Sequence, residues 1–516
     1  MSSVNNYSSY RPIIYSIVLI FGIFLGKNLI KNEDYGQLNY LNELIKNEDY
    51  GQLNYLNELI KNNYVDTINI EKINEQIFQK MLSELDPHST YISKKSFQQV
   101  DENMRGSFSG IGIEFSIIRD TVVVVAAISG GPSYDLGIQA GDKIIEVDNV
   151  DFCYPSISNS DVVNKLRGEK GTFVDIKILR PSIGKQIDYR IKRNDIPLVS
   201  IDSKFMINDS VGIIKINRFS ATTFDEFNSS IEDLLSKKMS HLVLDLRGNP
   251  GGYLDASINI CNHFFNEGTL LVYTEGNKRK RRNYFSDSFG KLQKTKLIVL
   301  IDEGSASASE ILAGAIQDND RGIIIGRKSF GKGLVQEEIR TKDGGAIRLT
   351  TQRYFTPSGR FIQKPYKSQD SLYSEKEFLT TKGRKVLSNG GITPDIIVPV
   401  DSSLNFSIIN IALVNGSLRD FCFDYASIIR SKGVEISEDN FNSQFNIQEA
   451  RDEFIKKYEL QEYITKLGKI ESEYLNLLIK ASIGRNLMGD YFYHKTLSTN
   501  DDFIESALKK FNSWEI

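Results

Sequence analysis

The chain has few of the residues that build metal centres and disulfide frameworks. Among its 516 residues are 3 cysteines, which lie far apart, and 4 histidines. It contains no Cys-x-x-Cys pair and no His-Glu-x-x-His sequence, two patterns that indicate zinc. An odd and sparse set of cysteines also argues against a disulfide framework. We therefore expect no metal and no cofactor.

A strong net charge is also missing. The 63 lysines and arginines are balanced by 66 aspartates and glutamates, for a formal net charge of −3. This balance provides no global attraction to nucleic acid or to anionic lipid. The one dense basic run, Lys278–Arg282, stands between two strand-like segments. Such a run can bind nucleic acid, but its position is typical of a solvated hairpin tip, and we expect no nucleic-acid partner.

One apolar run stands near the N-terminus. Residues 13–25 are apolar at all but three positions, with a basic residue shortly before and after them. This length suits the hydrophobic core of a secretory signal and is short for a membrane-spanning helix. No small-residue cleavage pattern follows the run, and no cysteine that could carry a lipid comes directly after it. We predict an uncleaved signal anchor within residues 1–30 that binds the membrane through residues 13–25, with the rest of the chain exported.

A duplicated segment follows the anchor. Residues 31–45 recur without change at 46–60. Perfect identity in one tandem copy indicates a recent duplication, because architectural repeats need several diverged units. Apolar residues at helical spacing then run from Ile70 to Leu85 and end at a turn marked by its proline, Asp86–Tyr91. We predict a helical N-terminal segment over residues 31–95, and we expect His88, in the turn, to be structural.

A glycine-rich segment opens the next domain. Gly110-Ile111-Gly112 is followed by a valine-rich strand and by the pattern Ala140–Val147, in which Ala-Gly-Asp leads into a second strand. This arrangement resembles a PDZ domain, which we place at residues 96–195. PDZ domains hold an extended peptide by strand addition and bind its C-terminal carboxylate on backbone N–H groups. The resemblance implies that Gly110, Ile111 and Gly112 form the carboxylate-binding loop.

Strands and helices alternate through the middle of the chain. This alternation predicts an α/β sheet whose site lies at the carboxyl ends of its strands. The segments that carry the pattern are a strand at 211–216, a helix at 224–235, a strand at 241–246, a helix at 254–264 and a strand at 270–273.

The stretch from residue 297 to residue 336 continues the alternation and carries the candidate catalytic residues. A buried strand is predicted at 297–301, and the helical spacing after it places three serines at the start of a helix, namely Ser305, Ser307 and Ser309. After the next apolar run, Lys332 stands between two glycines. A serine and a lysine placed in this way indicate a Ser/Lys nucleophile pair.

Three other motifs could account for this lysine or for the serines. Gly326 and Gly331-Lys332 nearly form a phosphate-binding loop, but a glycine replaces the magnesium-binding serine or threonine, and a strand replaces the helix. Ser329-x-x-Lys332 matches the first element of penicillin-binding enzymes, whose Lys-Thr-Gly and Ser-Asp-Asn elements are absent. The serines also lack the Gly-x-Ser-x-Gly frame of α/β-hydrolases. Peptide hydrolysis by a Ser/Lys pair remains.

The chemistry of such a pair sets requirements on its neighbours. A serine hydroxyl is a poor nucleophile until a base takes its proton. A lysine can be that base only when neutral, which requires burial to lower its pKa from about 10.4 to roughly 7–8. Gln336 could orient the amine, and backbone N–H groups at Ala308 and at the Gly251-Gly252 turn would stabilise the oxyanion. From this chemistry alone, each of the three serines remains a candidate nucleophile.

Taken together, these motifs resemble those of carboxy-terminal processing proteases, also called tail-specific proteases, over roughly residues 70–400. The stretches that carry the resemblance are Leu82–Ser89, Gly110–Gly112, Asp245–Gly252, Ser305–Glu310, Gly331–Gln336, Leu349–Thr351, Thr356–Arg360 and Gly391–Asp395.

The resemblance implies roles for individual residues. The nucleophile would be the middle serine, Ser307, with Lys332 at the spacing that the family requires and Gln336 at its third catalytic position. Arg167 is similar to the arginine by which some PDZ domains of the family sense substrate and switch the site on. The resemblance also implies a mixed α/β, ClpP/crotonase-like protease core at residues 196–400, into which the PDZ domain is inserted.

Beyond residue 400 the sequence predicts a helical C-terminal domain, residues 401–516, from three amphipathic stretches at 447–458, 463–481 and 503–511. It could serve dimerisation or bind an adaptor that delivers substrate. The implied protein is a serine endopeptidase of the cell envelope, anchored in the inner membrane with its catalytic part in the periplasm, that recognises protein C-termini and cleaves the polypeptide. The alternative is a PDZ scaffold that binds without proteolysis, against which the presence of Ser307, Lys332 and Gln336 argues.

Overall fold

The computed structural model describes residues 48–287, 290–366, 376–400, 409–410, 415–433, 436–465 and 467–514. It divides into two units, Met1–Met81 and Leu82–Ile516. The predicted signal anchor and the first copy of the duplicated segment lie outside the described residues. Within the described ranges, no helix has both the length and the hydropathy that crossing a membrane would require.

The first unit contributes two helices to the description. Most of the second copy of the duplication forms α3 (Glu48–Asn63), and α4 (Ile70–Ser83) follows. The two are joined by a hydrogen bond from Asn57 Nδ2 to Asn74 Oδ1 (3.0 Å). None of the side chains of α4 is buried within the chain.

The core of the second unit is a six-stranded sheet that is parallel except at one edge. Its strand order is β10-β11-β12-β15-β16-β21, with β10 antiparallel to β11. The strands are β10 (Ile201–Met206), β11 (Val211–Ile216), β12 (His241–Asp245), β15 (Lys296–Ile301), β16 (Ile323–Gly326) and β21 (Ile396–Ile397). Because parallel strands are covered on both faces, the apolar run at 297–301 is fully buried.

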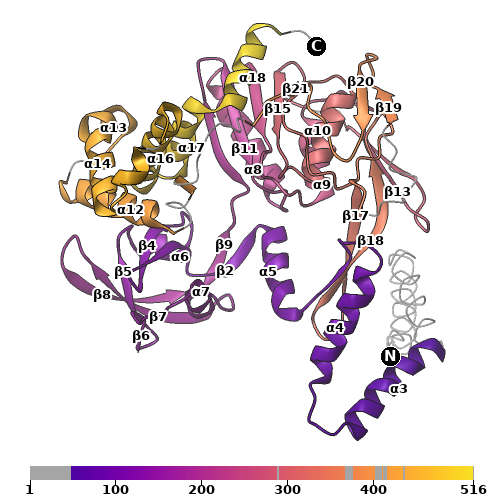
Figure 1. Cartoon of the computed structure of the whole chain (residues 1–516), viewed down its shortest axis with the longest axis horizontal. Coiled ribbons are helices and arrows are strands. Elements are labelled where there is room, and N and C mark those ends of the chain that lie inside the picture. The colour runs from indigo at the N-terminus through magenta and orange to yellow at the C-terminus, as the bar shows by residue number, and fades with distance from the viewer. Residues whose placement is uncertain are drawn as a thin grey trace, which may run out of the picture. The chain divides into compact units, whose positions relative to one another are not determined.

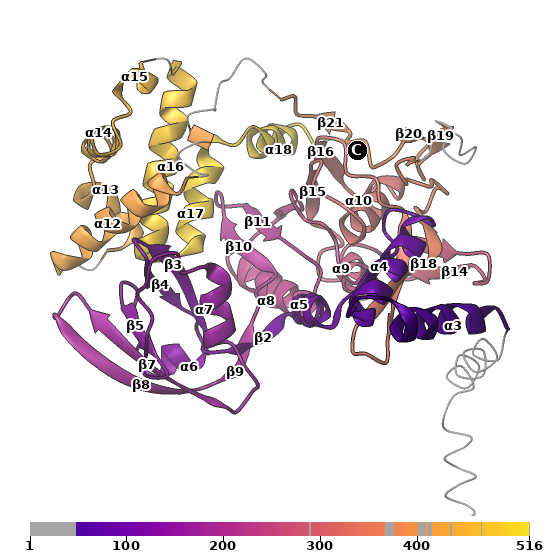
Figure 2. The ribbon, with the colours of Figure 1, turned by 60° about the horizontal axis from the view of Figure 1, so that its bottom comes forward.

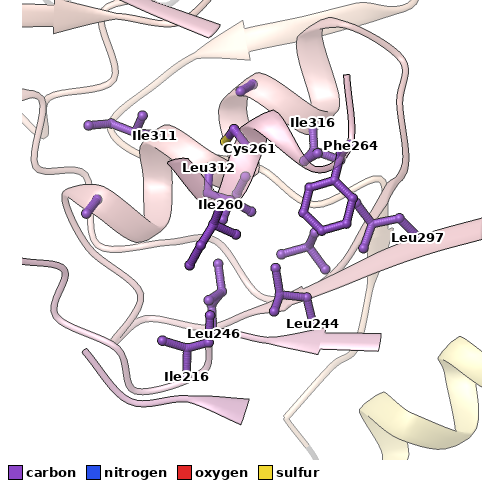
Figure 3. Close-up of a cluster of buried hydrophobic side chains, with 14 of the residues drawn as sticks. Ile216, Leu244, Leu246, Ile260, Cys261, Phe264, Leu297, Ile311, Leu312 and Ile316 are labelled. Atoms are coloured by element: carbon purple, nitrogen blue, oxygen red, sulfur yellow. The ribbon is translucent and has the colours of Figure 1, made fainter. Parts of the chain in front are cut away.

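Helices cover the two faces of this sheet. One face packs against α8 (Thr223–Ser236), α9 (Leu254–Asn262) and α10 (Ala308–Asp318), as Figure 3 shows for Leu244, Ile260 and Leu312. The opposite face is covered by the last helix of the chain, α18 (Asp502–Asn512), through Phe503 and Phe511. Figure 1 shows α18 beside the strands of this sheet, away from the other C-terminal helices.

A second, antiparallel sheet is built around one long strand. This strand, β18, pairs with β17 along one edge and with β1 and β13 on the other, and β14 pairs with β13. The basic run 278–282 lies at the tip of the β13–β14 hairpin, as the sequence predicts. The strands are β1 (Thr90–Ile92), β13 (Leu270–Glu275), β14 (Arg282–Phe285), β17 (Leu334–Arg340) and β18 (Ala346–Phe355), and a separate hairpin pairs β19 (Lys376–Leu379) with β20 (Lys385–Ser388).

The segment before the core sheet forms a small β domain with a hydrophobic core of its own. It follows α5 (Lys94–Arg105), and its sheet has the order β3-β4-β5-β7-β8, so that β3 is an edge strand. A capping box at Ser158 and Asp161 starts α7. The elements are β2 (Ser107–Gly110), β3 (Ile113–Ile118), β4 (Thr121–Ala127), α6 (Pro132–Asp135), β5 (Lys143–Val147), β6 (Val150–Asp151), α7 (Asn159–Leu166), β7 (Phe173–Arg180), β8 (Lys185–Lys192) and β9 (Asn194–Pro197).

The predicted C-terminal helical segment is divided between two hydrophobic cores. Six helices pack around one of them, while α18 packs on the six-stranded core sheet as described above. The six-helix group contacts the β domain through the ion pair of Arg485 with Glu114 (3.0 Å) and that of Arg119 with Asp424 (3.1 Å), and Figure 2 shows it beside β3 and β4. The six helices are α12 (Ser417–Ser431), α13 (Glu438–Gln444), α14 (Ile447–Lys457), α15 (Gln461–Ile464), α16 (Lys469–Met488) and α17 (Asp490–Leu497).

Candidate active site

The three serines at the start of α10 differ in what their hydroxyls contact. Ser305 Oγ donates to the carbonyl of Leu246 (2.8 Å), Ser309 Oγ donates to the carbonyl of Asn249 (3.0 Å), and both side chains are fully buried. Ser307 is only half-buried. The geometry therefore separates serines that the sequence leaves equivalent, because two of them tie the loop to the neighbouring strand end.

Ser307 also stands in an unusual backbone conformation. Its φ of 55° lies in the left-handed region, which non-glycine residues seldom occupy. The surrounding hydrogen bonds hold it there: the N–H of Ala306 donates to the carbonyl of Asn249 (2.9 Å), and the N–H of Ser307 donates to the Glu310 carboxylate (2.8 Å). A strained turn of this kind, between a strand and a helix, keeps one side chain in a fixed position.

Glu310 joins the serine turn to the lysine loop. One carboxylate oxygen accepts from the N–H groups of Ser307 and Lys332 (both 2.8 Å), and the other accepts from Ser329 Oγ (2.6 Å) and the N–H of Gly331 (2.7 Å). The side chain is fully buried. Burial raises the pKa of Glu310 to about 7, against the opposing effect of these four donors. The role of Glu310 was not predicted from the sequence, although a glutamate three residues after a serine at a helix start is a capping pattern.

Lys332 follows β16, in a loop that passes close to other backbone segments. A Cβ on Gly331 would lie 2.8 Å from the backbone of Gly390, and one on Gly333 would lie 2.9 Å from the backbone nitrogen of Gln363. Burial lowers the pKa of Lys332, the charge of Arg348 lowers it further, and Glu310 and Asp86 act in the opposite direction. The loop thus places Lys332 where the neutral form of its amine is more favoured than it would be in water.

Gln336 lies within hydrogen-bonding distance of that amine. Lys332 Nζ donates to Gln336 Oε1 (2.9 Å), and Gln336 Nε2 donates to the carbonyl of His88 (2.7 Å). The register of β17 against β18 shifts between Val335 and Gln336. Such an irregularity re-aims the side chains of a strand. Lys332 and Gln336 are therefore brought together as the sequence predicts, and both belong to one connected set with Glu310 and Ser307.

The glycine turn after β12 packs directly on the serine turn. A Cβ on Gly251, whose φ is 97°, would lie 2.8 Å from Ser307 Cβ and 2.9 Å from the nitrogen of Ala308. The N–H of Gly251 is used, because it donates to Asn249 Oδ1 (2.9 Å). In the described part of the chain, the N–H groups of Gly252 and Ala308 donate to no protein acceptor. Of the two candidate glycines, Gly252 thus keeps a free donor.

The candidate carboxylate-binding loop of the β domain lies at the start of edge strand β3. The carbonyl of Ile111 accepts from the N–H of Ser133 (3.0 Å), and that of Gly112 accepts from the N–H of Ile128 (2.9 Å). Among the described residues, the N–H groups of Ile111 and Gly112 have no acceptor. The loop therefore has its carbonyls fixed by the protein and two donors left over, while Gly110 ends β2.

Arg167 lies at the end of α7 and is engaged away from the serine and lysine turns. Its guanidinium forms an ion pair with Glu102 of α5 (2.6 Å) and stacks over the ring of Phe108 (4.0 Å to the ring centroid). Glu102 is 7% exposed. The arginine thus connects α7 of the β domain to the helix that precedes that domain.

Comparisons with known proteins agree with these observations. Residues 210–373 match peptidase family S41, and residues 123–180 match the PDZ domain. A carboxy-terminal-processing protease of Bartonella bacilliformis is 35% identical over 352 residues, which cover 67% of this chain and 80% of that protein. The carboxy-terminal processing protease CtpB of Bacillus subtilis is 37% identical over 304 residues, covering 58% of this chain and 63% of that protein.

Among solved structures, a photosystem II D1 C-terminal processing protease is 24% identical, with a TM-score of 0.36, over 69% of this chain and 95% of its own. The sequence relatives establish the family to which the chain belongs. The structure confirms the predicted mixed α/β, multidomain architecture. The sequence relatives confirm the predicted serine peptidase activity and argue against a scaffold without proteolysis. The chain belongs to the carboxy-terminal processing proteases of peptidase family S41 and combines a serine peptidase core with a PDZ domain.

Proposed function

We propose that this peptidase cleaves polypeptides with Ser307 as nucleophile and Lys332 as general base, and that its PDZ domain selects substrates by their C-termini. The observation that carries the proposal is the connected set at the strand ends. In it a desolvated lysine amine donates to Gln336, and Glu310 joins its loop to the serine turn. Of the three serines, Ser307 alone is not fully buried.

The reaction would proceed by acyl transfer. The neutral amine of Lys332 takes the proton of Ser307 Oγ as that oxygen attacks the scissile carbonyl, and the resulting ammonium is stabilised by Gln336 Oε1. The N–H groups of Ala308 and Gly252 stabilise the oxyanion of the tetrahedral intermediate. Lys332 then returns the proton to the leaving amine. In the second half it activates a water that hydrolyses the acyl-enzyme.

Tail recognition would use the free edge of the PDZ sheet. A peptide that adds to β3 as an antiparallel strand brings its terminal carboxylate to the N–H groups of Ile111 and Gly112, which have no acceptor in the described part of the chain. Tail binding between β3 and α7 would move Arg167 away from Glu102, and the arginine would then report substrate to the core. The ion pair of Arg167 with Glu102 represents the state without a tail.

We further propose that the enzyme works in the cell envelope, anchored at the inner membrane with its catalytic part in the periplasm. This proposal rests on the apolar run at residues 13–25 and its basic flanks. An adaptor or a second copy would bind through the terminal helical segments. Fractionation of cells that express the full chain, with protease protection of intact spheroplasts, tests the location, and a cytosolic fraction would contradict it.

The test of the chemistry is cleavage of a reporter protein that ends in a flexible, apolar tail. The variants Ser307→Ala and Lys332→Ala should reduce cleavage by at least about a thousandfold, the usual cost of losing a nucleophile or its base. Ser236→Ala and Lys342→Ala serve as matched controls, because both residues are exposed and lie outside the site. Parent-like cleavage by both site variants would overturn the assignment. An amidated tail should be cleaved more slowly than a free one, and equal rates would overturn the proposed role of the PDZ domain.

A further inference from the structure

The turn Asp86–Ser89 contacts the candidate site through a backbone atom. Gln336 Nε2 donates to the carbonyl of His88 (2.7 Å), while Gln336 Oε1 accepts from Lys332 Nζ (2.9 Å). A carbonyl oxygen can only accept, and an ammonium can only donate. While Lys332 is protonated, the amide therefore has one allowed orientation, since a flipped amide would place oxygen against oxygen at one end and N–H against N–H at the other.

The position of the His88 carbonyl is set by Asp86. One carboxylate oxygen accepts from the N–H groups of His88 and Ser89 (both 2.8 Å), and the other accepts from Ser89 Oγ (2.7 Å). Asp86 and Ser89 are only 7% and 4% exposed. Burial alone would raise the pKa of Asp86, but the hydrogen bonds outweigh it and leave the pKa below its usual value. An ionised carboxylate thus closes the turn through these three hydrogen bonds.

The same turn is attached to the sheet that carries Gln336. Ser89 Oγ accepts from the N–H of Thr350 (3.1 Å), and Thr350 is the residue of β18 that stands opposite Gln336 in the β17–β18 register. Directly after the turn, β1 pairs with β18. The turn and the glutamine are therefore fixed to the same point of one strand, although 248 positions separate His88 from Gln336 in the sequence.

We propose that Asp86 and Ser89 are positioning residues for the amide of Gln336. They hold the His88 carbonyl against Gln336 Nε2, so that Oε1 faces the amine of Lys332. The inference deepens the function proposed above and rests on it. His88 was expected to be structural, and in the structure it contacts Gln336 through its backbone carbonyl. Burial lowers the pKa of its imidazole, and so does the charge of Lys332, which keeps a second cation away from the amine.

The consequence for the reaction concerns the lone pair of the base. A neutral amine has one lone pair, which must face the serine hydroxyl when the proton is transferred. An amide fixed at both ends restrains the rotation of that amine, whereas a free amide would let it turn. Asp86 and Ser89 themselves are buried and closed into the turn, so their loss should lower kcat and leave KM within about twofold.

A double-mutant cycle in the full chain tests this. Asp86→Ala and Gln336→Ala should each lower kcat by about tenfold or more, and the double variant should be no slower than Gln336→Ala alone. Asp86→Asn keeps an oxygen that can accept from both N–H groups, so it should lie closer to the parent than Asp86→Ala. If the loss of kcat in the double variant equals the product of the losses in the two single variants, the proposal is overturned, because Asp86 would then act without Gln336.

Asn208→Ala is the matched control for a loosened turn. Asn208 Oδ1 accepts from the N–H groups of Ser210 (3.0 Å) and Val211 (2.9 Å) in a turn of the same kind before β11. It belongs to the same core and has no contact with the lysine loop. Asn208→Ala should leave kcat near the parent value, and its effect should multiply with that of Gln336→Ala. A coupling to Gln336 as large as that of Asp86 would overturn the proposal.

A measurement without turnover separates this inference from the function on which it rests. Competitive acetylation of the intact protein over a pH series, read by mass spectrometry, gives the pKa of Lys332. Ser89→Ala is the variant to use, because removing Asp86 would also remove a charge that acts on Lys332. Ser89→Ala and Gln336→Ala should both lower this pKa, since the ammonium loses its oriented acceptor. A shift in Gln336→Ala with none in Ser89→Ala would overturn the positioning role. Full activity of Ser307→Ala would overturn only the proposed chemistry.

Discussion

The serine and lysine turns of the core and the carboxylate loop of the PDZ domain are built in opposite ways. In the core, each turn follows a buried parallel strand and is closed by buried polar groups, with Glu310 alone accepting from four donors. In the PDZ domain, the loop precedes an edge strand, and the N–H groups of Ile111 and Gly112 have no acceptor among the residues that the structure describes. In the proposed function, the core has its geometry before substrate arrives, whereas the PDZ loop would receive acceptors for these N–H groups from the substrate.

The last helix of the chain supports the core side of this comparison. Phe503 of α18 lies under two guanidinium groups, with Arg247 at 4.6 Å and Arg327 at 4.9 Å from its ring centroid. Arg247 follows β12 ahead of the glycine turn and also pairs with Asp501 (2.8 Å), while Arg327 follows β16 ahead of the lysine loop. The two loops are therefore held from the opposite side of the sheet as well.

Replacing Glu310 should have the largest effect on this comparison. In Glu310→Gln, the amide nitrogen faces two donors in place of an accepting oxygen, and each buried donor left without a partner costs about 1–3 kcal/mol. We expect kcat to fall by about a thousandfold and the melting temperature to drop. Glu303→Gln is the control, since Glu303 is 63% exposed and pairs with Arg327. Parent-like turnover by Glu310→Gln would show that the two turns do not depend on each other.

The glycine turn should be the next most sensitive point. In Gly251→Ala, the new Cβ would lie 2.7 Å from the carbonyl oxygen of Ala306 and 2.8 Å from Ser307 Cβ. Displacing the serine turn by about 1 Å should cost about a hundredfold in kcat. Gly248→Ala, in the same loop, has a similar positive φ of 69° but open space around its Cβ, so it controls for backbone strain. Equal losses in the two variants would mean that strain, rather than contact with Ser307, explains the effect.

The PDZ side should respond more weakly and through a different quantity. Glu102→Gln removes the charge that pairs with Arg167, so Arg167 should leave its resting position more readily. We expect cleavage of a reporter with an amidated tail to rise by about tenfold, within the usual range of coupling between two sites. Cleavage of the same reporter with a free tail should hardly change. A fall in both rates would show that this ion pair supports the active arrangement instead of opposing it.

The smallest expected effect is a shift in a pH profile. In the proposed mechanism Lys332 acts as a neutral base. We therefore expect kcat/KM to rise with pH and to level off at a midpoint below the pKa of an ordinary lysine, because burial favours the neutral amine. The charge of Arg348 lowers this pKa further. Arg348→Gln should therefore move the midpoint to higher pH, whereas Arg190→Gln, an exposed pair with Asp175 in the PDZ domain, should not. A midpoint that moves to lower pH in Arg348→Gln would contradict the assignment of Lys332.

The features that the sequence predicts are those recorded in adjacent residues. The apolar run at 297–301, the serines at a helix start and the lysine between glycines each lie within a few positions, so periodicity and motif place them. The sequence shows Glu310 three positions after Ser307. Its partners Ser329, Gly331 and Lys332, however, lie about twenty positions away on another loop. No local sequence pattern predicts that these distant residues contact Glu310.

The other features that the sequence did not predict are contacts between distant segments. The amphipathic pattern at 503–511 predicts a helix, but it does not say that this helix covers the protease sheet rather than its neighbours in sequence. The turn at Asp86–Ser89 carries a family motif, yet its contact with Gln336 spans 248 positions. Conversely, the distinction between Ser307 and its two neighbours needed the hydrogen bonds of the folded chain, because their chemistry is the same.

The central claim is that Ser307 is the nucleophile and that Lys332 activates it. Covalent trapping with a serine-reactive fluorophosphonate, followed by peptide mapping of the intact chain, tests both parts at once. We expect one modified residue, Ser307, with the label lost in Ser307→Ala and reduced in Lys332→Ala by about the same factor as cleavage. A label on Ser305 or Ser309, or labelling of Ser307 that does not depend on Lys332, would contradict it.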